Sequence, residues 1–285
     1  MPHPPDPRIA VCSWSLGPDD ESPPRLIETL AVLEIGAVQL ALGPLVEARP
    51  EWSDMLPALR AAGVEVASGM MAMAGEDYTT LESIARTGGV RPDETWPANR
   101  LHAAAVARLA ASEGIDLVTF HAGFLPHDRD DPRRGVMLER LRLIADLFGE
   151  LGVQLALETG QESAETLLEV LADLERPNVG VNFDPANMIL YGQGEPVDGL
   201  RRLAPYVRQI HVKDAVPAEA PATWGREVPV GRGAVDWPAF LDVAEGIQPP
   251  VRYVIEREAG RQRAGDIAAA RDLVADHLGI RADPA

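Results

Sequence analysis

The chain has 285 residues, of which 46% are hydrophobic and 25% charged, a composition typical of one large globular domain. Its 44 acidic residues outnumber 26 basic ones and give a net charge of -18, which repels phosphate backbones and anionic lipids, so neither nucleic acid nor a membrane is an expected partner. The single cysteine, Cys12, excludes an intrachain disulfide and favours a cytoplasmic protein, and no run approaches the ~20 apolar residues of a membrane span.

Short apolar runs alternate with helical segments from the start of the chain. Residues 1–8 are rich in proline and predict a flexible tail. Strands are expected at 9–15, 37–42 and 64–69, and helices at 22–36 and 51–63. Residues 70–97 then form an insertion too long for an ordinary connection. We expect residues 75–96 of this insertion to fold over the functional site once substrate binds, with Gly88 and Gly89 as the hinge.

The alternation resumes after the insertion and continues to the end of the chain. Helices are expected at 98–113, 134–151, 163–174, 196–206, 237–245 and 265–278, and strands at 116–123, 153–158, 179–184, 209–213 and 252–256. Eight strands spaced by roughly 35 residues predict a single α/β domain, a (β/α)8 TIM barrel over 9–280, followed by a flexible tail at 281–285. A doubly wound open sheet is the main alternative, but no Gly-rich phosphate turn follows the first strand.

Four of the later predicted strands end on a residue that can bind a divalent metal. These residues are Glu158, Asp184, His211 and Glu256. Each falls on the less apolar face of its strand, the face that would line the interior of a barrel. Because the C-terminal strand ends of such barrels form the active site, we expect the four side chains to converge. Three carboxylates and one imidazole suit one Mn²⁺, Mg²⁺, Co²⁺ or Zn²⁺ ion, with Mn²⁺ as the first choice.

Several segments resemble those of xylose-isomerase-like TIM barrels, the sugar phosphate isomerase and epimerase superfamily. These segments are LALETG, NFDPANMILYG, IHVKDA, GREVPVGRGAVDWPAF and VIERE. The resemblance implies that the four strand-end residues bind one divalent metal. It also implies that Arg226 binds substrate, because ketose 3-epimerases carry a similar Arg-containing segment after the metal-binding His. The chain departs from those epimerases at Asn187 and Ala164, where they carry a His and a substrate-binding Glu.

Other candidate substrate-binding residues lie beside these strand ends. His121, in the segment FHAG, resembles a His of the endonuclease branch of the superfamily. The chain lacks two further features of that branch's trinuclear site, a His at the position of Asn187 and an Asp-x-His pair at 226–228. A histidine bonded to a neighbouring strand end remains the alternative. Lys213 points the same way as His211, and Trp14 would either stack on substrate or fill the core. Together with Arg226 and Asn187, these residues form the expected substrate-binding set.

The combined pattern predicts a metal-dependent isomerase or epimerase of a sugar, sugar phosphate or keto-polyol. Glu158 and Glu256 are the predicted catalytic residues: one ionised carboxylate takes a proton beside a carbonyl, the other returns it, and the metal stabilises the enediolate. A keto-sugar or inosose dehydratase or lyase begins with the same proton abstraction and is one alternative. A barrel that binds a sugar or metal without turnover is another. The expected partner is a small carbohydrate, and a homo-oligomer is left open.

Overall fold

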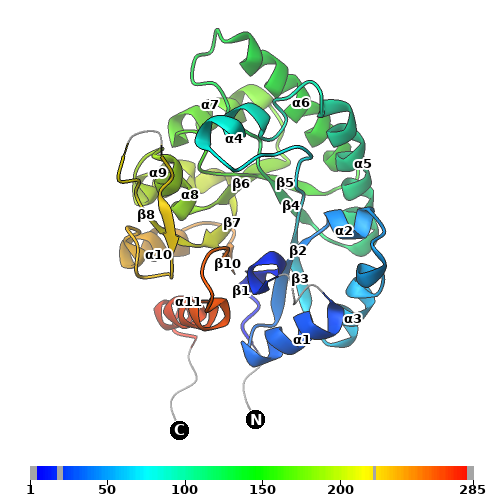
Figure 1. Ribbon diagram of the computed structural model, residues 1–285, viewed down its shortest axis with the longest axis vertical. Helices are drawn as coiled ribbons and strands as arrows, with labels where there is room; N and C mark the ends of the chain where they lie inside the picture. The colour runs from blue at the N-terminus through cyan, green and yellow to red at the C-terminus, as the bar shows by residue number, and fades with distance from the viewer. Residues whose placement is uncertain (1–4, 18–21, 221–222, 281–285) are drawn as a thin grey trace.

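The computed structural model of the protein describes residues 5–17, 22–220 and 223–280. Eight parallel strands close into a barrel in the order β1-β10-β7-β6-β5-β4-β3-β2 (Figure 1). The strands are β1 (Ile9–Cys12), β2 (Ala37–Ala41), β3 (Glu65–Met70), β4 (Leu117–Phe120), β5 (Gln154–Glu158), β6 (Val179–Phe183), β7 (Val207–Val212) and β10 (Arg252–Ile255). The predicted barrel is thus confirmed. Parts of the two predicted tails, residues 1–4 and 281–285, lie outside the described residues.

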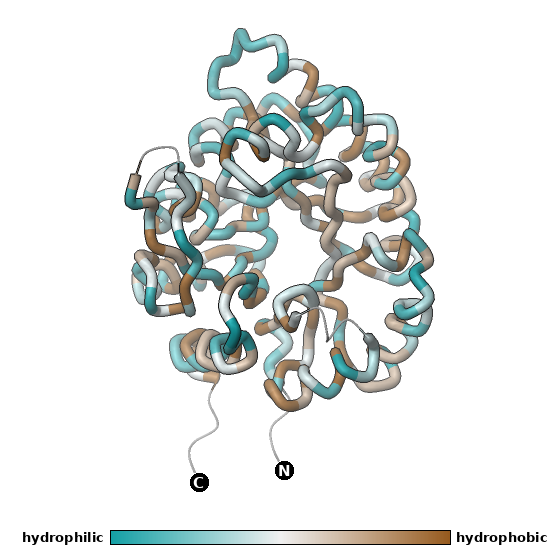
Figure 2. Tube along the Cα trace, viewed as in Figure 1, coloured by the Kyte–Doolittle hydropathy of each residue, from teal (hydrophilic) through white to brown (hydrophobic). Residues whose placement is uncertain are grey.

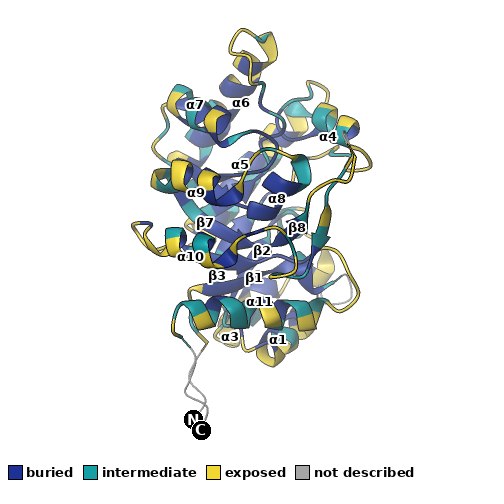
Figure 3. Cartoon of the chain, turned by 90° about the vertical axis from the view of Figure 1, so that its left-hand side faces the viewer, coloured by how far each residue is buried: buried dark blue, intermediate teal, exposed yellow. Residues whose placement is uncertain are grey.

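Helices surround the barrel, with one side buried and the other exposed (Figure 3). They are α1 (Pro23–Val32), α3 (Met55–Ala61), α5 (Trp96–Glu113), α6 (Pro132–Gly149), α7 (Ala164–Leu174), α9 (Pro196–Leu203), α10 (Trp237–Glu245) and α11 (Arg263–His277). Local signals fix several helix starts: Ser163, for example, caps α7 by accepting a hydrogen bond from the backbone N–H of Thr166. Within the described ranges, no helix has both the length and the apolar sequence needed to cross a membrane.

The two faces of the strands differ as their alternation predicts. Hydrophobic stretches run along the strands (Figure 2), and outward residues such as Val181 and Ile210 join the large core under the helices. Inside the barrel, small apolar residues including Ala10 and Cys12 form a separate cluster. The barrel interior therefore has room for polar side chains below the C-terminal strand ends.

Buried polar side chains fill that room and bond to one another. Gln39 Nε2 donates to Thr119 Oγ1 (2.8 Å), and Ser68 Oγ donates to Gln209 Oε1 (2.6 Å). Gln209 Nε2 in turn donates to Asn182 Oδ1 (3.1 Å). Because buried polar groups are costly unless they are paired, these bonds hold the polar side chains of the barrel interior in place below the C-terminal strand ends.

Short elements that the sequence analysis did not predict decorate the C-terminal end of the barrel. They are α2 (Gly43–Val46), α4 (Leu81–Thr87), α8 (Pro185–Tyr191), the antiparallel pair β8 (Asp214–Val216) and β9 (Arg226–Val228), and a 3-10 turn at Ser13–Leu16. The first strand is correspondingly shorter than expected, since the chain turns after Cys12. These elements build the walls around the strand ends.

The insertion between β3 and α5 is fastened to the barrel, and its two glycines are not positioned as a hinge. The backbone N–H of Val90 donates to Ala122 O (3.0 Å), and Gly89 (φ 62°) packs so closely on Ala122 and Gly123 that a Cβ would collide with their backbone. Arg140 of α6 also donates to the carbonyl oxygen of Val90 (2.8 Å). The expected hinge at Gly88 and Gly89 is therefore corrected: glycine is needed there for close backbone approach.

Candidate metal centre and active site

The four predicted metal ligands converge at one point, as expected. Glu158 ends β5, Asp184 follows β6, His211 lies near the end of β7 and Glu256 follows β10. One ligand atom from each lies within 4.8 Å of the others, and all four residues are buried. Because β5, β6, β7 and β10 are neighbours in the barrel, strand closure alone brings these side chains together.

The atoms that face the centre of this cluster fit a bound cation. His211 Nδ1 lies 3.5 Å from Glu158 Oε1, 3.7 Å from Asp184 Oδ2 and 3.4 Å from Glu256 Oε2. Among the described residues, His211 Nδ1 and Asp184 Oδ2 are buried atoms without a hydrogen-bond partner. Buried polar atoms are rarely left unpaired, so this pair is suited to coordinate an ion between them.

Gln39 holds the imidazole of His211 in the orientation that metal binding requires. His211 Nε2 lies 2.8 Å from Gln39 Oε1 and 3.0 Å from Asn182 Nδ2. In the neutral tautomer whose Nε2–H donates to Gln39, Nδ1 keeps its lone pair for a metal. Gln39 is itself fixed by its bond to Thr119. The Gln39 amide therefore sets both the tautomer and the ring orientation.

We expect Gln39→Met to weaken metal binding about 10- to 100-fold, because the thioether cannot accept the imidazole N–H strongly. The side chain keeps a similar volume, so the fold should survive. Isothermal titration with Mn²⁺ measures the change, and the exposed residue Gln262 offers the same substitution as a control. An Mn²⁺ affinity in Gln39→Met equal to that of the control would contradict this role.

The charges of the cluster shift the protonation of its members. Burial alone would lower the pKa of His211, but Glu158 and Glu256 outweigh it and raise that pKa well above its usual value. Burial would raise the pKa of both glutamates, but the neighbouring cations hold it below the usual value at Glu158 and well below it at Glu256. Burial raises the pKa of Asp184 to about 6. Both predicted catalytic carboxylates thus favour the ionised form, and the expected division into one acid and one base is not evident in their pKa values.

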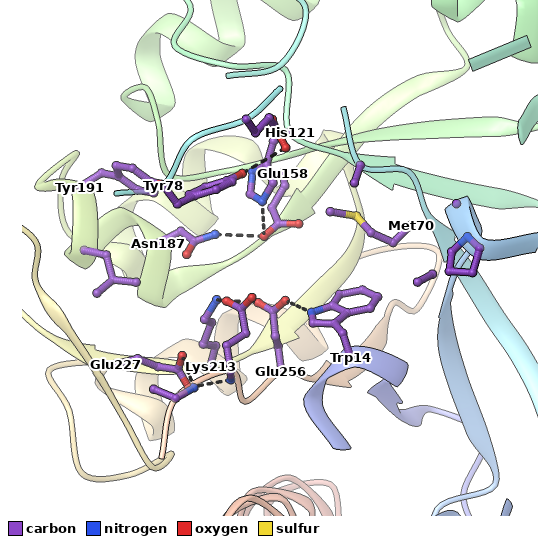
Figure 4. A pocket seen from close by; sticks show the side chains of 18 of the residues that line it. Trp14, Met70, Tyr78, His121, Glu158, Asn187, Tyr191, Lys213, Glu227 and Glu256 are labelled. Carbon is purple, nitrogen blue, oxygen red and sulfur yellow. Dashed lines mark hydrogen bonds and ion pairs between the residues drawn. The ribbon is translucent and has the colours of Figure 1, made fainter. Parts of the chain in front are cut away.

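A cavity of about 660 Å³ opens above the cluster, with Glu158 and Glu256 in its lining (Figure 4). Four of the five predicted substrate-binding residues also line it, namely Trp14, His121, Asn187 and Lys213. The structure thus places most of the expected site in one cavity at the C-terminal end of the barrel, where TIM-barrel active sites lie.

These four residues hold the two glutamates in place. Asn187 Nδ2 donates to Glu158 Oε1 (2.9 Å), and His121 Nε2 lies 3.5 Å from the same oxygen. Trp14 Nε1 donates to Glu256 Oε1 (2.7 Å), and Lys213 Nζ donates to Glu256 Oε2 (2.7 Å). For Trp14, the structure adds a role to the two considered from the sequence, since its indole N–H orients a carboxylate.

Arg226, the fifth predicted substrate-binding residue, is exposed and does not belong to the cavity lining. Its neighbour Glu227 lines the cavity instead and accepts hydrogen bonds from Arg257 Nη1 (2.5 Å) and the backbone N–H of Glu258 (3.1 Å). Successive residues of β9 point in opposite directions, so the hairpin turns Arg226 away from the site. The prediction for Arg226 therefore finds no support in its position.

The sequence analysis missed most of the cavity wall. The additional lining residues that bear on the site are Glu76, Leu190, Tyr191, Trp224, Glu227 and Glu258. Tyr78, noted only as an aromatic residue of the insertion, also lines the cavity. A signal for Leu190 and Tyr191 was present, because residues three and four positions after Asn187 share its face once a helix begins at Pro185. Trp224 follows no periodic pattern.

The loop after β5 carries a further buried carboxyl group, Glu162, which is not part of the cavity lining. Burial raises its pKa from 4.5 to about 8. The native state therefore keeps a proton that the unfolded chain loses above about pH 4.5, and stability must fall as pH rises from there to about 8.

We expect the free energy of unfolding to drop by about 3 to 5 kcal/mol across that range because of Glu162. Glu162→Gln should remove this part of the pH dependence and stabilise the protein at pH 8. Urea unfolding from pH 5 to 9 measures the effect, with the exposed Glu165→Gln on α7 as a control. Parallel pH profiles for Glu162→Gln and the wild type would show the expectation to be wrong.

Comparisons with known proteins agree with this geometry. The crystal structure of a xylose isomerase domain protein from Planctomyces limnophilus is 33% identical, with a TM-score of 0.84 over 96% of this chain and 98% of that one. Two more distant structures share the fold: a xylose isomerase-like TIM barrel protein from Mycobacterium smegmatis in complex with magnesium (19% identity, TM-score 0.72, 95% and 96% covered) and a D-tagatose 3-epimerase-like protein (15% identity, TM-score 0.72, 95% and 97% covered).

One curated relative, the uncharacterized protein YihM of Escherichia coli (strain K12), is 24% identical over 135 residues. This match covers 47% of the chain and 40% of YihM, so it spans less than half of that protein. A family model described as xylose isomerase-like TIM barrel matches residues 29–277, nearly the whole barrel. The chain therefore belongs to the family of xylose isomerase-like TIM barrels.

Proposed function

We propose that this protein is a divalent-metal-dependent sugar isomerase or epimerase that moves a proton at a carbon next to a carbonyl group. The observation that carries the proposal is the buried cluster of Glu158, Asp184, His211 and Glu256 on the floor of the cavity. Family membership and the epimerase-like structural neighbour support the same class of reaction. The proposed partner is a small carbohydrate that enters this cavity.

The four residues of the cluster would hold one metal ion, and we propose Mn²⁺ because the set combines hard carboxylates with one imidazole. When bound, the ion would polarise the substrate carbonyl and stabilise the negative charge of an enediolate. Gln39, Trp14, Asn187 and Lys213 keep the ligand atoms in place through the bonds described above.

Glu158 and Glu256 are positioned to move the proton. They enter the cavity from strands on different sides of the site, as Figure 4 shows, and both favour the ionised form that can accept a proton. One carboxylate would take the proton from the substrate carbon. Delivery of the proton to the former carbonyl carbon, together with a proton shift between the two oxygens, gives an isomer. Delivery to the original carbon on its opposite face gives an epimer, and the other carboxyl group must first take up that proton from solvent.

Lys213 and His121 supply positive charge beside these carboxylates. Carboxylate neighbours, acting against burial, raise the pKa of both residues, so Lys213 is cationic near neutral pH and the charged form of His121 is favoured. Lys213 Nζ bonds to Glu256, and His121 Nε2 lies close to Glu158. In this arrangement, each glutamate that would accept a proton has a neighbouring cation that stabilises its ionised form.

Turnover in D2O tests the proposal. The Mn²⁺-loaded protein would be incubated with D-fructose, D-tagatose and D-psicose, and the products analysed by NMR spectroscopy. We expect an isomer or epimer that carries deuterium at the carbon that lost its proton. A product that has lost water would identify a dehydratase or lyase instead, and fast turnover without deuterium would indicate hydride transfer and exclude the two-carboxylate scheme.

A further inference from the structure

The charge of the cavity wall does not suit an anionic substrate. Six carboxylates line the cavity: Glu47, Glu76, Glu158, Glu227, Glu256 and Glu258. In the described part of the chain, the lysine and arginine side chains of the lining are Lys213 and Arg49, and both are already paired. Arg49 Nη2 lies 2.8 Å from Glu47 Oε2, and Lys213 Nζ lies 2.7 Å from Glu256 and 2.6 Å from Glu258.

The two histidines of the lining do not change this excess of negative over positive charge. Burial lowers the pKa of His102, which favours its neutral form. His121 Nε2 already lies 3.5 Å from Glu158 Oε1. Phosphate groups are usually bound by arginine or lysine side chains that have charge to spare. The cavity lacks such a cation among its described residues.

Above the polar floor, the wall is apolar and rich in rings. Tyr191 is fixed between two aromatic neighbours, with its ring centroid 5.5 Å from that of Phe124 and 5.0 Å from that of Trp224. In Figure 4, Tyr78 and Tyr191 lie on one side of the two glutamates, and Trp14 and Met70 lie on the other. The faces of these rings suit a flat apolar ring.

The size of the cavity also favours a substrate that carries an apolar ring beside its sugar. At about 660 Å³, it falls among pockets that enclose drug-sized ligands, which are larger than one monosaccharide. A single sugar bound over Glu158 and Glu256 would leave the space beside Tyr78, Tyr191 and Trp224 without a ligand group. The ring faces of these three residues border that space, so we expect an apolar, ring-sized occupant against them.

We infer that the substrate is an uncharged, unphosphorylated sugar that carries an apolar, ring-sized substituent, with the sugar over the glutamates and the substituent against Tyr191 and Trp224. The inference rests on the proposed function only in placing the sugar over the metal cluster. It names a narrower class than sugars in general, because it excludes sugar phosphates and predicts a preference for an aromatic group.

Isothermal titration of the Mn²⁺-saturated protein with three probes tests the inference. The probes are phenyl β-D-glucopyranoside, methyl β-D-glucopyranoside and D-glucose 6-phosphate. We expect the phenyl glucoside to bind at least about tenfold tighter than the methyl glucoside, because its ring is buried against the aromatic wall. The phosphate should bind no tighter than the methyl glucoside.

Variants show whether the preference comes from the aromatic wall. Tyr191→Leu and Trp224→Ala should each reduce the phenyl preference to less than about threefold, whereas Tyr206→Leu, outside the cavity lining, should keep it. Equal binding of the two glucosides, including binding of neither, would overturn the inference, and so would tightest binding of the phosphate. This experiment measures a ratio of binding constants and requires no turnover. Equal binding of the two glucosides would therefore leave the D2O result valid, and an absence of turnover would leave the ratio measurable.

Discussion

Glu256→Gln will lower kcat by about 10²- to 10⁴-fold in the Mn²⁺-loaded protein, the range that a positioned proton acceptor contributes. The amide keeps an oxygen that can face the metal, but it cannot take a proton from carbon. Glu158→Gln should have a similar effect for the same reason. Both rates are measured with whichever sugar shows deuterium exchange, alongside metal content, which should stay near that of the wild type.

Glu258→Gln is the matched control for these two variants. Glu258 lines the same cavity and accepts a hydrogen bond from Lys213 (2.6 Å), but it is not part of the metal cluster. Its loss should lower kcat by about tenfold or less, since only the position of Lys213 is disturbed. If Glu256→Gln were no slower than Glu258→Gln, the catalytic assignment of Glu256 would have to be abandoned.

Removal of divalent metal will abolish activity and lower the melting temperature. Glu158, Asp184 and Glu256 lie close together in the buried cluster, and a cation bound only to the native state stabilises it by mass action. At a metal concentration of about 1,000 times Kd, this stabilisation is about 4 kcal/mol, which corresponds to roughly 10 °C for a domain of this size.

Scanning calorimetry before and after dialysis against EDTA measures this shift, and re-addition of Mn²⁺, Co²⁺ or Mg²⁺ should reverse it. Asp184→Ala provides the internal control, because it removes both oxygens of a ligand whose Oδ2 otherwise has no partner. This variant should melt at the same temperature with and without Mn²⁺. A wild-type melting temperature that did not respond to metal would count against the site.

The strands and the metal cluster could be predicted because both follow from a two-residue alternation. Once Val181 and Phe183 are assigned to the outer face, Asp184 must lie on the inner side, and barrel closure brings it to Glu158 and His211. No comparable constraint acts on the loops. Trp224 reaches the cavity from the connection between β8 and β9, where no periodic pattern indicates a direction.

Arg226 shows how a difference of one residue decides which side chain of a segment faces the cavity. The sequence identified the right stretch, and β9 does border the site, but its pairing with β8 places Glu227 opposite Ala215 and Arg226 opposite Val216. In a two-stranded hairpin, a shift of one residue reverses every side chain, and that register depends on tertiary packing rather than on local sequence. Glu227 therefore takes the inward position.

The insertion illustrates a second limit. A glycine pair is compatible with a hinge and equally with close packing of two backbones, and only the contact with Ala122 distinguishes the two. The sequence correctly indicated that the insertion reaches the site, since Glu76 and Tyr78 line the cavity. Its attachment through Arg140 could not be read from the spacing of residues.

Direct titration with Mn²⁺, followed by electron paramagnetic resonance of the free ion, tests the central claim that four strand-end residues bind one metal. We predict one Mn²⁺ per chain for the wild type and for His102→Ala, whose side chain lines the cavity outside the cluster. The double variant Asp184→Ala and His211→Ala should bind none at the same concentration. A wild-type chain that binds no Mn²⁺ at saturation, or a double variant that binds it as well as the wild type, would contradict the account.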